Sequence, residues 1–250
     1  MSLSEIFAIS LGEFNNTGTG TTSLSDFYFS ELASECRNKL KESGYNIVHV
    51  EDMAAIREIV EILGKPYLTP RLSPFLNDFT PKNCFWLLLE RGDETIAAGG
   101  CRFDDLGDMK LSQFWTNCVA RHYDKTGGAI VDVAAPVDEH LSGRLVYFGD
   151  LVVREDFRGA KTGQILKLFT HFAISFAMLK FDPESAYAFV RERDVGRGAM
   201  KFYGFNTVIH QAQTWSNAPA YHRNDDACMF VTKKYFSYYA RLLSQLPEKL

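Results

Sequence analysis

The stretch DLVVREDFRGAKTGQILKLF, residues 150–169, determines how this chain is interpreted. It begins inside the apolar, β-branched run RLVYFGDLVV, residues 144–153, which predicts a strand. A short turn follows, and a long helix is predicted over residues 162–180. The apolar residues of that helix recur at helical spacing: Ile165, Phe169, Phe172 and Phe176. The stretch therefore predicts a strand that leads through a glycine-containing turn into a helix.

The turn RGAKTG, residues 158–163, has the composition of an anion-binding site. The first amide hydrogens of a helix have no internal partner, and the helix dipole places partial positive charge there. Gly159 and Gly163 lack Cβ atoms, so a phosphate can approach the backbone closely. Arg158 and Lys161 add full positive charges. The alternative is an ordinary strand-to-helix turn, because short glycine motifs often recur by chance.

On both sides of this stretch, hydrophobic periodicity predicts further helices and strands. Helices are expected at residues 26–43 (capped by Ser25), 52–63, 109–122, 198–203 and 235–246. Strands are expected at residues 45–50, 84–90, 95–103, 130–133, 186–190, 205–210 and 226–232. A hairpin combined with crossover helices predicts an α/β fold of the α+β type, a mixed sheet with helices on both faces.

The domain organisation follows from composition along the chain. Residues 1–22, rich in Gly, Asn and Thr, predict a flexible tail, and residues 23–44 an extra N-terminal helix. No linker rich in Pro or Ser divides the rest, so residues 45–250 are expected to form one domain. The stretch 104–140 is an insert that we expect to shape the acceptor site.

Composition excludes several classes of protein. A hydrophobic content of 46% indicates a globular chain, and a net charge of −4 disfavours a nucleic-acid binder. No uncharged apolar run reaches about 18 residues, so no membrane span is expected. The N-terminus lacks the cationic start of a secretory signal, which favours a cytoplasmic location. The five cysteines include no CxxC pair, so we expect buried free thiols and no metal site.

Two motifs carry a family resemblance. RGAKTG resembles the pyrophosphate-binding motif Gln/Arg-x-x-Gly-x-Gly/Ala of the GNAT superfamily of acyl-CoA-dependent N-acyltransferases, although Lys161 stands where the family prefers glycine. GAMKFYGF, residues 198–205, is similar to the family's Ala-x-x-Phe-Tyr-x-x-Gly-Phe ending. Ala199, Phe202 and Tyr203 match, whereas Gly204-Phe205 comes two residues early. The resemblance begins at about residue 45 and implies a GNAT-like fold with a central, mostly antiparallel mixed sheet.

The resemblance implies how an acyl-CoA would bind. Its pyrophosphate would rest on the amides of the glycine turn, and its pantetheine arm would run beside the end of the strand at 144–153. That strand and the one at 186–190 would splay apart to admit it. The cofactor-binding residues implied in this way are Leu151, Val152, Val153, Arg158, Gly159, Ala160, Lys161, Thr162, Gly163 and Gln164.

The implied reaction, direct acyl transfer from a thioester to an amine, poses two proton problems. An alkyl amine with a pKa near ~10.4 costs about 4–5 kcal/mol to deprotonate at neutral pH, and the leaving thiolate benefits from a proton donor. The resemblance implies Tyr203 as that donor. We take Asp150 as the candidate base; the alternative is that it points away, because side chains alternate along a strand. Its rivals are Asp138, Glu139 and His140.

The acceptor is left open between a small amine, an amino acid, a polyamine and a protein lysine. Besides the insert, we expect the first helices and the loop at 212–225 to build its pocket. Acidic residues of the insert suit a cationic amine or form a solvated surface: Asp104, Asp105, Asp108, Asp124 and Asp138. Phe114, Trp115 and Trp215 either shape a pocket or fill the core. The apolar stripe of the last helix is expected to face the core, with a homodimer contact as its alternative.

The function expected from these observations is an N-acetyltransferase that uses acetyl-CoA and no metal to acylate a primary amine. The alternative is a non-catalytic acyl-CoA-binding or regulatory module on the same fold, favoured by the lysine in the glycine motif. An acyl-homoserine-lactone synthase ranks last, because no pattern in the chain supports it. No nucleic-acid or membrane partner is expected.

Overall fold

The computed structural model describes residues 23–50, 52–65, 67–119, 122–123, 130–218 and 222–246, so the predicted tail at 1–22 lies outside the described residues. The α-helices are α1 (Leu24–Glu42), α2 (Ile56–Ile62), α3 (Leu111–Gln113), α4 (Pro136–His140), α5 (Ala160–Phe181), α6 (Glu192–Val195), α7 (Ala199–Tyr203) and α8 (Lys233–Gln245). The strands are β1 (Asn46–Val50), β2 (Cys84–Arg91), β3 (Glu94–Asp105), β4 (Ile130–Val133), β5 (Arg144–Val153), β6 (Ser185–Arg191), β7 (Thr207–Ile209), β8 (Gln213–Trp215) and β9 (Asp226–Thr232).

Seven of these strands form one sheet in the order β1-β2-β3-β5-β6-β9-β7, and β4 and β8 form a separate pair. Within the large sheet only β5 and β6 run parallel, and every other neighbouring pair is antiparallel. The crossover between β5 and β6 is the long helix α5, as a parallel connection requires. The predicted fold class, a mostly antiparallel mixed sheet in an α/β chain, is confirmed.

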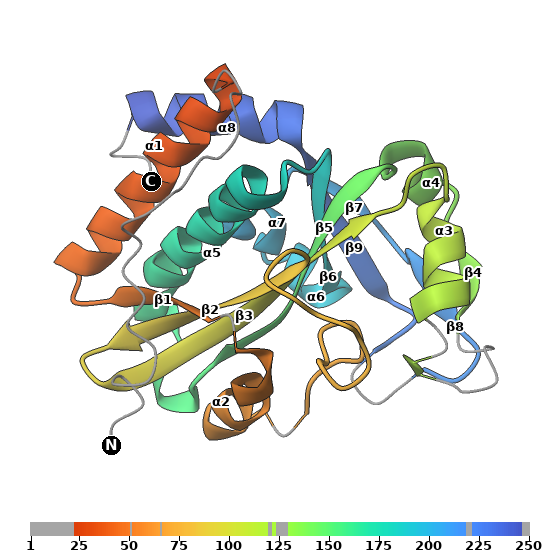
Figure 1. Ribbon diagram of the computed structural model, residues 1–250, viewed down its shortest axis with the longest axis horizontal. Coiled ribbons are helices and arrows are strands. Elements are labelled where there is room, and N and C mark those ends of the chain that lie inside the picture. The colour runs from red at the N-terminus through yellow and green to blue at the C-terminus, as the bar shows by residue number, and fades with distance from the viewer. Residues whose placement is uncertain are drawn as a thin grey trace.

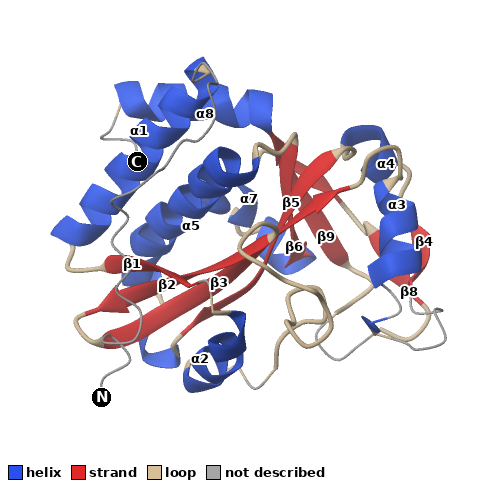
Figure 2. Ribbon diagram, in the orientation of Figure 1, coloured by secondary structure: helices blue, strands red, loops and turns tan. Residues whose placement is uncertain are grey.

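Helices cover both faces of this sheet, as expected (Figure 1). One face is covered by α1, α5 and α8, and α1 packs against both of the other helices. Their apolar stripes meet the sheet in one continuous core, and the stripe of α8 contributes Phe236 and Leu243 to it. The opposite face carries α2 and, toward one end, α3 and α4 with the small β4–β8 sheet (Figure 2). None of the described helices is long and apolar enough to cross a bilayer.

The start of α1 differs from the expectation. The helix begins at Leu24 and is capped by Ser23, whose hydroxyl accepts a hydrogen bond from the amide of Asp26 at 3.2 Å. The carboxylate of Asp26 accepts one in return from the amide of Ser23 at 3.1 Å. Ser25, the predicted cap, lies within the first turn and hydrogen-bonds to Ser237 of α8 at 2.9 Å. The reciprocal capping box satisfies two backbone donors and outweighs a single serine cap.

The insert and the loop after β7 also depart from the expectation. The helix predicted at 109–122 is a short α3 followed by a π-helical turn, Phe114–Val119. The hydroxyl of Thr116 donates to the carbonyl of Ser112 at 2.9 Å, a side-chain bond that competes with regular helix. The strand predicted at 205–210 shortens to β7, and the loop at 212–225 contains a strand, β8, that sequence periodicity did not reveal.

Several side chains left open by the sequence belong to the core. Trp115 and Trp215 are buried, at 0% and 3% exposure.

Four of the five cysteines are buried free thiols, as expected, and Cys118 is half-buried. Burial raises the pKa of the thiols of Cys36, Cys84 and Cys228 to about 12. These cysteines are packing residues and are inert as nucleophiles at neutral pH.

Candidate active site

The strands β5 and β6 pair in parallel along only about half of their length. The register runs from Leu145 opposite Ser185 to Phe148 opposite Ala188 and stops there. Beyond that point β5 stays paired with β3, and β6 stays paired with β9 as far as Arg191. The two strands therefore diverge after Phe148 and Ala188, as expected for a pair that admits a ligand between them.

A bulge marks the point of divergence. On β3, Ala98 pairs with Val152 and Gly100 with Gly149, so Gly99 alone faces both Asp150 and Leu151. Asp150 has a positive φ of 53°, which L-residues rarely adopt. A β-bulge of this kind re-aims side chains and often lies beside a functional site.

Two glycines beside the bulge leave room for aromatic rings to pack against the backbone. A Cβ on Gly100 would lie 2.7 Å from the ring of Trp86, and one on Gly149 would lie 2.5 Å from the hydroxyl of Tyr147. Neither position accepts a side chain without displacing an aromatic ring. The close packing of the bulge therefore depends on both glycines.

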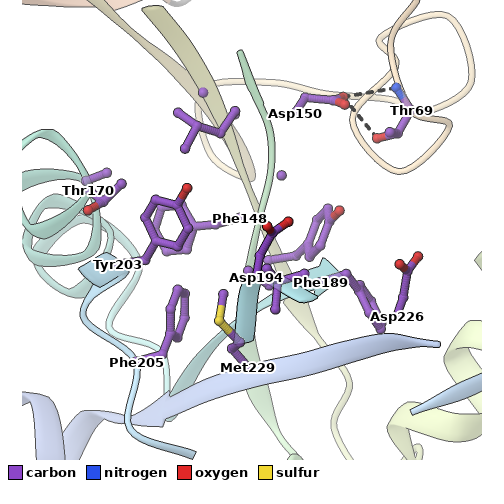
Figure 3. Close-up of a pocket in the computed structure, with 18 of the residues that line it drawn as sticks. Thr69, Phe148, Asp150, Thr170, Phe189, Asp194, Tyr203, Phe205, Asp226 and Met229 are labelled. Carbon is purple, nitrogen blue, oxygen red and sulfur yellow. Dashed lines mark hydrogen bonds between the residues drawn. The ribbon is translucent and has the colours of Figure 1, made fainter. Parts of the chain in front are cut away.

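A cavity of about 360 Å³ opens where the strands diverge. It reaches both faces of the sheet, because neighbouring residues of β5 and β6 point to opposite sides. Toward α5 the lining is mostly apolar, with Thr170 and Tyr203 as polar exceptions; toward the other face it includes several polar and ionisable side chains. Figure 3 shows Tyr203 and Phe205 on one side of β5, and Asp150, Thr69 and Asp226 on the other.

In the polar half, Asp150 is held by the segment that follows α2. Its side chain is fully buried and forms an ion pair with Lys65. Its second oxygen accepts hydrogen bonds from the amide of Thr69 at 3.0 Å and from the Thr69 hydroxyl at 2.9 Å. Both carboxylate oxygens are thus engaged, and these contacts hold Lys65 and Thr69 against the bulge of β5.

A histidine–aspartate pair also faces the polar half. Nδ1 of His222 lies 3.2 Å from the carboxylate of Asp226, and Nε2 lies 3.1 Å from the hydroxyl of Tyr123. A carboxylate only accepts, so Nδ1 carries the hydrogen and Nε2 is left as the acceptor. Burial lowers the pKa of His222; the bond to Asp226 opposes this, and the positive charge of Arg71 adds to it. The imidazole is therefore neutral at neutral pH, as a general base must be.

Tyr203 lines the cavity from the end of α7, next to the apolar half (Figure 3). Its ring packs edge-on against Phe202, with ring centroids 5.0 Å apart. Burial, and secondarily the negative charge of Asp194, raise the pKa of its hydroxyl. Tyr203 therefore stays protonated at neutral pH and is able to donate a hydrogen.

The start of α5 follows closely on the end of β5. Gly159 precedes the first helical residue, Ala160, and has no side chain to cap the helix. Its φ of +142° and ψ of −176° belong to a region that only glycine adopts readily. Nε of Arg158 donates to the carbonyl of Val153 at 2.9 Å, which fastens the turn to the end of the strand. The side chain of Lys161 lies outside the described residues.

The predicted site residues are partly brought together. Asp150, Leu151 and Tyr203 line the cavity, whereas the rival bases Asp138, Glu139 and His140 do not. Asp138 instead accepts hydrogen bonds from the amide and hydroxyl of Ser112, at 2.9 and 2.6 Å.

The insert and the loop after β7 contribute differently. No described residue of the insert at 104–140 lines the cavity, so its role in shaping the acceptor site stays a prediction. The loop at 212–225 contributes His222, and the first helices contribute none of the lining residues.

Sequence reasoning missed the four polar lining residues that form the hydrogen-bonded groups described above: Lys65, Thr69, His222 and Asp226. It also missed Thr170, Arg191, Arg193 and Asp194. Three of the first four come from segments without strong periodicity, and only the four-residue spacing of His222 and Asp226 offered a local signal. Among the described residues, no three His, Cys, Asp or Glu side chains gather as metal ligands would.

No protein-family profile matches the chain, and no curated protein sequence is significantly similar to it. Solved structures do resemble it, and several are N-acetyltransferases, one of them described as a member of the GNAT family, which the two motifs resemble. A GNAT acetyltransferase from Streptococcus pneumoniae is 11% identical, with a TM-score of 0.41 over 75% of this chain and 99% of that one.

Two further solved structures have similar scores. The polyamine N-acetyltransferase of Drosophila melanogaster is 10% identical, with a TM-score of 0.47 over 75% of this chain and all of that one (100%). FeeM, an N-acyl amino acid synthase from uncultured soil microbes, is 11% identical, with a TM-score of 0.42 over 81% and 98% of the two chains. At these identities and scores the likeness says nothing about the activity of this chain.

Proposed function

We propose that this protein is an N-acyltransferase that transfers an acyl group, acetyl in the simplest case, from acyl-CoA to a primary amine. The observation that supports it is the divergence of β5 and β6 over a cavity, with the start of α5 directly beyond. An acyl-CoA is a long molecule with an anionic end, an amide-bearing arm and a reactive thioester. The site offers a matching region for each part.

The donor would bind in an extended form. Its pyrophosphate is assigned to the backbone amides at the start of α5, where the helix dipole and the absence of a capping side chain favour an anion. Its pantetheine arm is assigned to the unpaired edge of β5 at Leu151–Val153, where backbone groups can bond to its amides as an added strand would. The thioester then lies near Gly149 and Tyr203.

In the proposed reaction the amine nitrogen attacks the thioester carbonyl carbon, the C–N bond forms and the C–S bond breaks. The nitrogen gives up a proton, and the leaving thiolate of CoA takes one. Tyr203, whose raised pKa keeps it protonated, donates to the thiolate and recovers its proton from water.

We assign the base role to His222, because its Nε2 is an acceptor and Asp226 stabilises the imidazolium that forms. The Tyr123 hydroxyl, bonded to Nε2, can relay the proton. Asp150 remains the alternative base. Because both of its oxygens are engaged by Lys65 and Thr69, we favour a positioning role for it, in which it holds these two residues against the bulge.

The test measures CoA thiol release from acetyl-CoA with a panel of primary amines. Tyr203→Phe should lower kcat about a hundredfold and leave the Kd for acetyl-CoA nearly unchanged, because only the proton donor is lost. The matched control is Tyr28→Phe on α1, which does not line the cavity and should leave both constants unchanged. An unchanged kcat in Tyr203→Phe removes the acid role.

The two candidate bases are separated by the pH profile of kcat/KM. A neutral imidazole is required, so activity should fall as the pH drops through the lowered pKa of His222, below its ordinary value of about 6.5. His222→Gln should lower kcat and remove this acid limb, whereas Asp150→Asn should retain it. If Asp150→Asn abolishes the limb and His222→Gln keeps it, Asp150 is the base.

The second candidate function is the non-catalytic acyl-CoA-binding module, favoured by the ion pair that engages the carboxylate of Asp150. It predicts acetyl-CoA binding without thiol release for every amine in the panel.

A further inference from the structure

We propose that the donor of this enzyme carries an acyl chain of several carbons, and that the chain enters the apolar half of the cavity between α5 and the sheet. We call this half the acyl chamber and define it by Phe85, Phe169, Ala173, Ile174, Phe205 and Met229. The proposal rests on the proposed function, because it assigns the chain of the same acyl-CoA.

The acyl chamber is formed by core residues that line the cavity wall. Phe85 and Ile174 are each 1% exposed and Met229 is 2% exposed, yet all three line the cavity. Protein interiors are normally close-packed, and empty volume beside buried apolar side chains destabilises a fold. An apolar group that fills the chamber on binding recovers those lost contacts.

The chemistry of the chamber selects a hydrocarbon. None of its six side chains carries a hydroxyl, amide or charge. The same side of the cavity also has two hydroxyls, that of Tyr203, the proposed proton donor, and that of Thr170, which donates to the carbonyl of Lys167 at 3.0 Å. The six chamber side chains therefore offer no hydrogen-bond partner to an amine. The ionisable groups Lys65, Asp150 and His222 lie in the other half. An amine acceptor therefore fits the polar half, and the apolar half is left for the donor.

The position of the chamber relative to the thioester agrees with this assignment. The chamber adjoins Tyr203, the proposed proton donor to the thiolate, and Phe148 and Ala188, the last paired residues before the strands diverge. In Figure 3, Tyr203, Phe148, Phe205 and Met229 lie together on one side of β5. A chain that starts at a thioester beside Tyr203 thus leads directly into the chamber.

The first measurement is the Kd and kcat/KM for acetyl-, butyryl-, hexanoyl-, octanoyl- and decanoyl-CoA with one amine. Each CH2 that moves from water into the chamber should tighten binding roughly fourfold until the chamber is full. We expect an optimum above acetyl-CoA and a fall once the chain exceeds the available length.

A filling variant locates the chain. Ala173→Leu adds a branched side chain inside the chamber and should lower the octanoyl-to-acetyl ratio of kcat/KM at least roughly tenfold. The matched control is Ala177→Val, one turn further along α5, which is buried but does not line the cavity. It should lose stability without changing the ratio. If Ala173→Leu does not fold, Ala188→Val makes the same test from β6.

Each outcome decides a separate question. If no acyl-CoA of any length binds, the proposed function fails. If acetyl-CoA is used and longer chains bring no gain, the chamber proposal alone is overturned. A preference for long chains that Ala173→Leu and Ala188→Val leave unchanged overturns it too, because the chain then lies elsewhere. A rate that depends on the apolar size of the amine, and not on the acyl chain, assigns the chamber to the acceptor and also overturns the proposal.

Discussion

The two long helices that pack against each other, α1 and α5, begin in opposite ways (Figure 1). The start of α1 is closed by its own residues, with Ser23 and Asp26 each bonding to the backbone of the other. The start of α5 is preceded by Gly159, which has no side chain to offer and a backbone conformation suited to glycine. Both helices face the same problem of unpaired amide donors.

Of the two helix starts, only that of α5 is available to a ligand. At α1 the capping box engages two backbone donors, and no residue of α1 lines the cavity described above. At α5 the unclosed end lies beyond the point where β5 leaves β6. The combination of an uncapped start and an open strand edge, and not either feature alone, is what suits an extended anionic ligand.

The middle of α5 contains a buried histidine, His171, and both of its ring nitrogens are hydrogen-bonded. Nδ1 of His171 donates to the carbonyl of Lys167 at 2.7 Å, and Nε2 accepts from the hydroxyl of Tyr239 on α8 at 3.0 Å. Burial lowers the pKa of His171 to about 4. The neutral ring is therefore the form that the fold accommodates.

The titration of His171 gives the largest expected effect, which is on the free energy of unfolding. The unfolded chain binds the proton near pH ~6.5, and the folded chain only near 4, so protonation favours unfolding. The free energy of unfolding should be unaffected by His171 above about pH 6.5 and should fall by about 3 kcal/mol as the pH drops from there toward 4. Denaturant unfolding across this pH range measures it.

His171→Gln provides the control, because glutamine lacks the titration. The variant should be less stable at neutral pH and should lose this component of the pH dependence. Identical pH dependence in the two proteins would show that His171 does not titrate as its burial requires.

The next effect concerns the start of α5. Gly159→Ala forces a side chain into a backbone region that costs about 1–3 kcal/mol for other residues, so the turn should change conformation. The Kd for acetyl-CoA should rise by roughly tenfold or more, measured by calorimetry.

Gly163→Ala is the matched control within the same motif. A Cβ there would meet only Phe202, at 3.5 Å, which is ordinary contact. Although the motif includes Gly163 in the proposed phosphate-binding turn, its Cβ position faces Phe202 of α7, so the Kd should stay close to that of the unsubstituted protein. Equal weakening in the two variants would mean that the loss reflects the motif's packing and not the conformation of Gly159.

The smallest effect concerns the start of α1. Ser23→Ala removes the capping box and should lower the free energy of unfolding by about 1 kcal/mol, with no change in acetyl-CoA affinity. Thermal or denaturant unfolding measures the first quantity and calorimetry the second. A changed affinity would contradict the separation between a closed helix start and a ligand-binding one.

The sequence predicted the elements around β5 closely. The expected bounds of β4, β5 and β9 agree with the structure, and α5 begins two residues before the expected position. These elements have strong local signals: β-branched runs for the strands and a long apolar stripe for the helix. The short elements α4, α6 and β8 lack such signals and depend on contacts with distant segments.

The polar half of the site could not be predicted from the sequence, because it also depends on contacts between distant segments. Asp150 was identified on its strand, but its partners Lys65 and Thr69 lie more than eighty positions earlier in the chain. Their contact depends on the bulge at Asp150 and on its positive φ, neither of which periodicity predicts. His222 lies in a loop, where no regular pattern indicates which way a side chain points.

The most direct test is calorimetric titration of the full chain with acetyl-CoA, with CoA and ATP as comparison ligands. Binding of acetyl-CoA in the micromolar range, weakened by Gly159→Ala and not by Ser23→Ala, is the result predicted for a donor seated between β5 and β6 at the start of α5. No binding of acetyl-CoA up to millimolar concentration would contradict the account and remove the acyltransferase reading of the site.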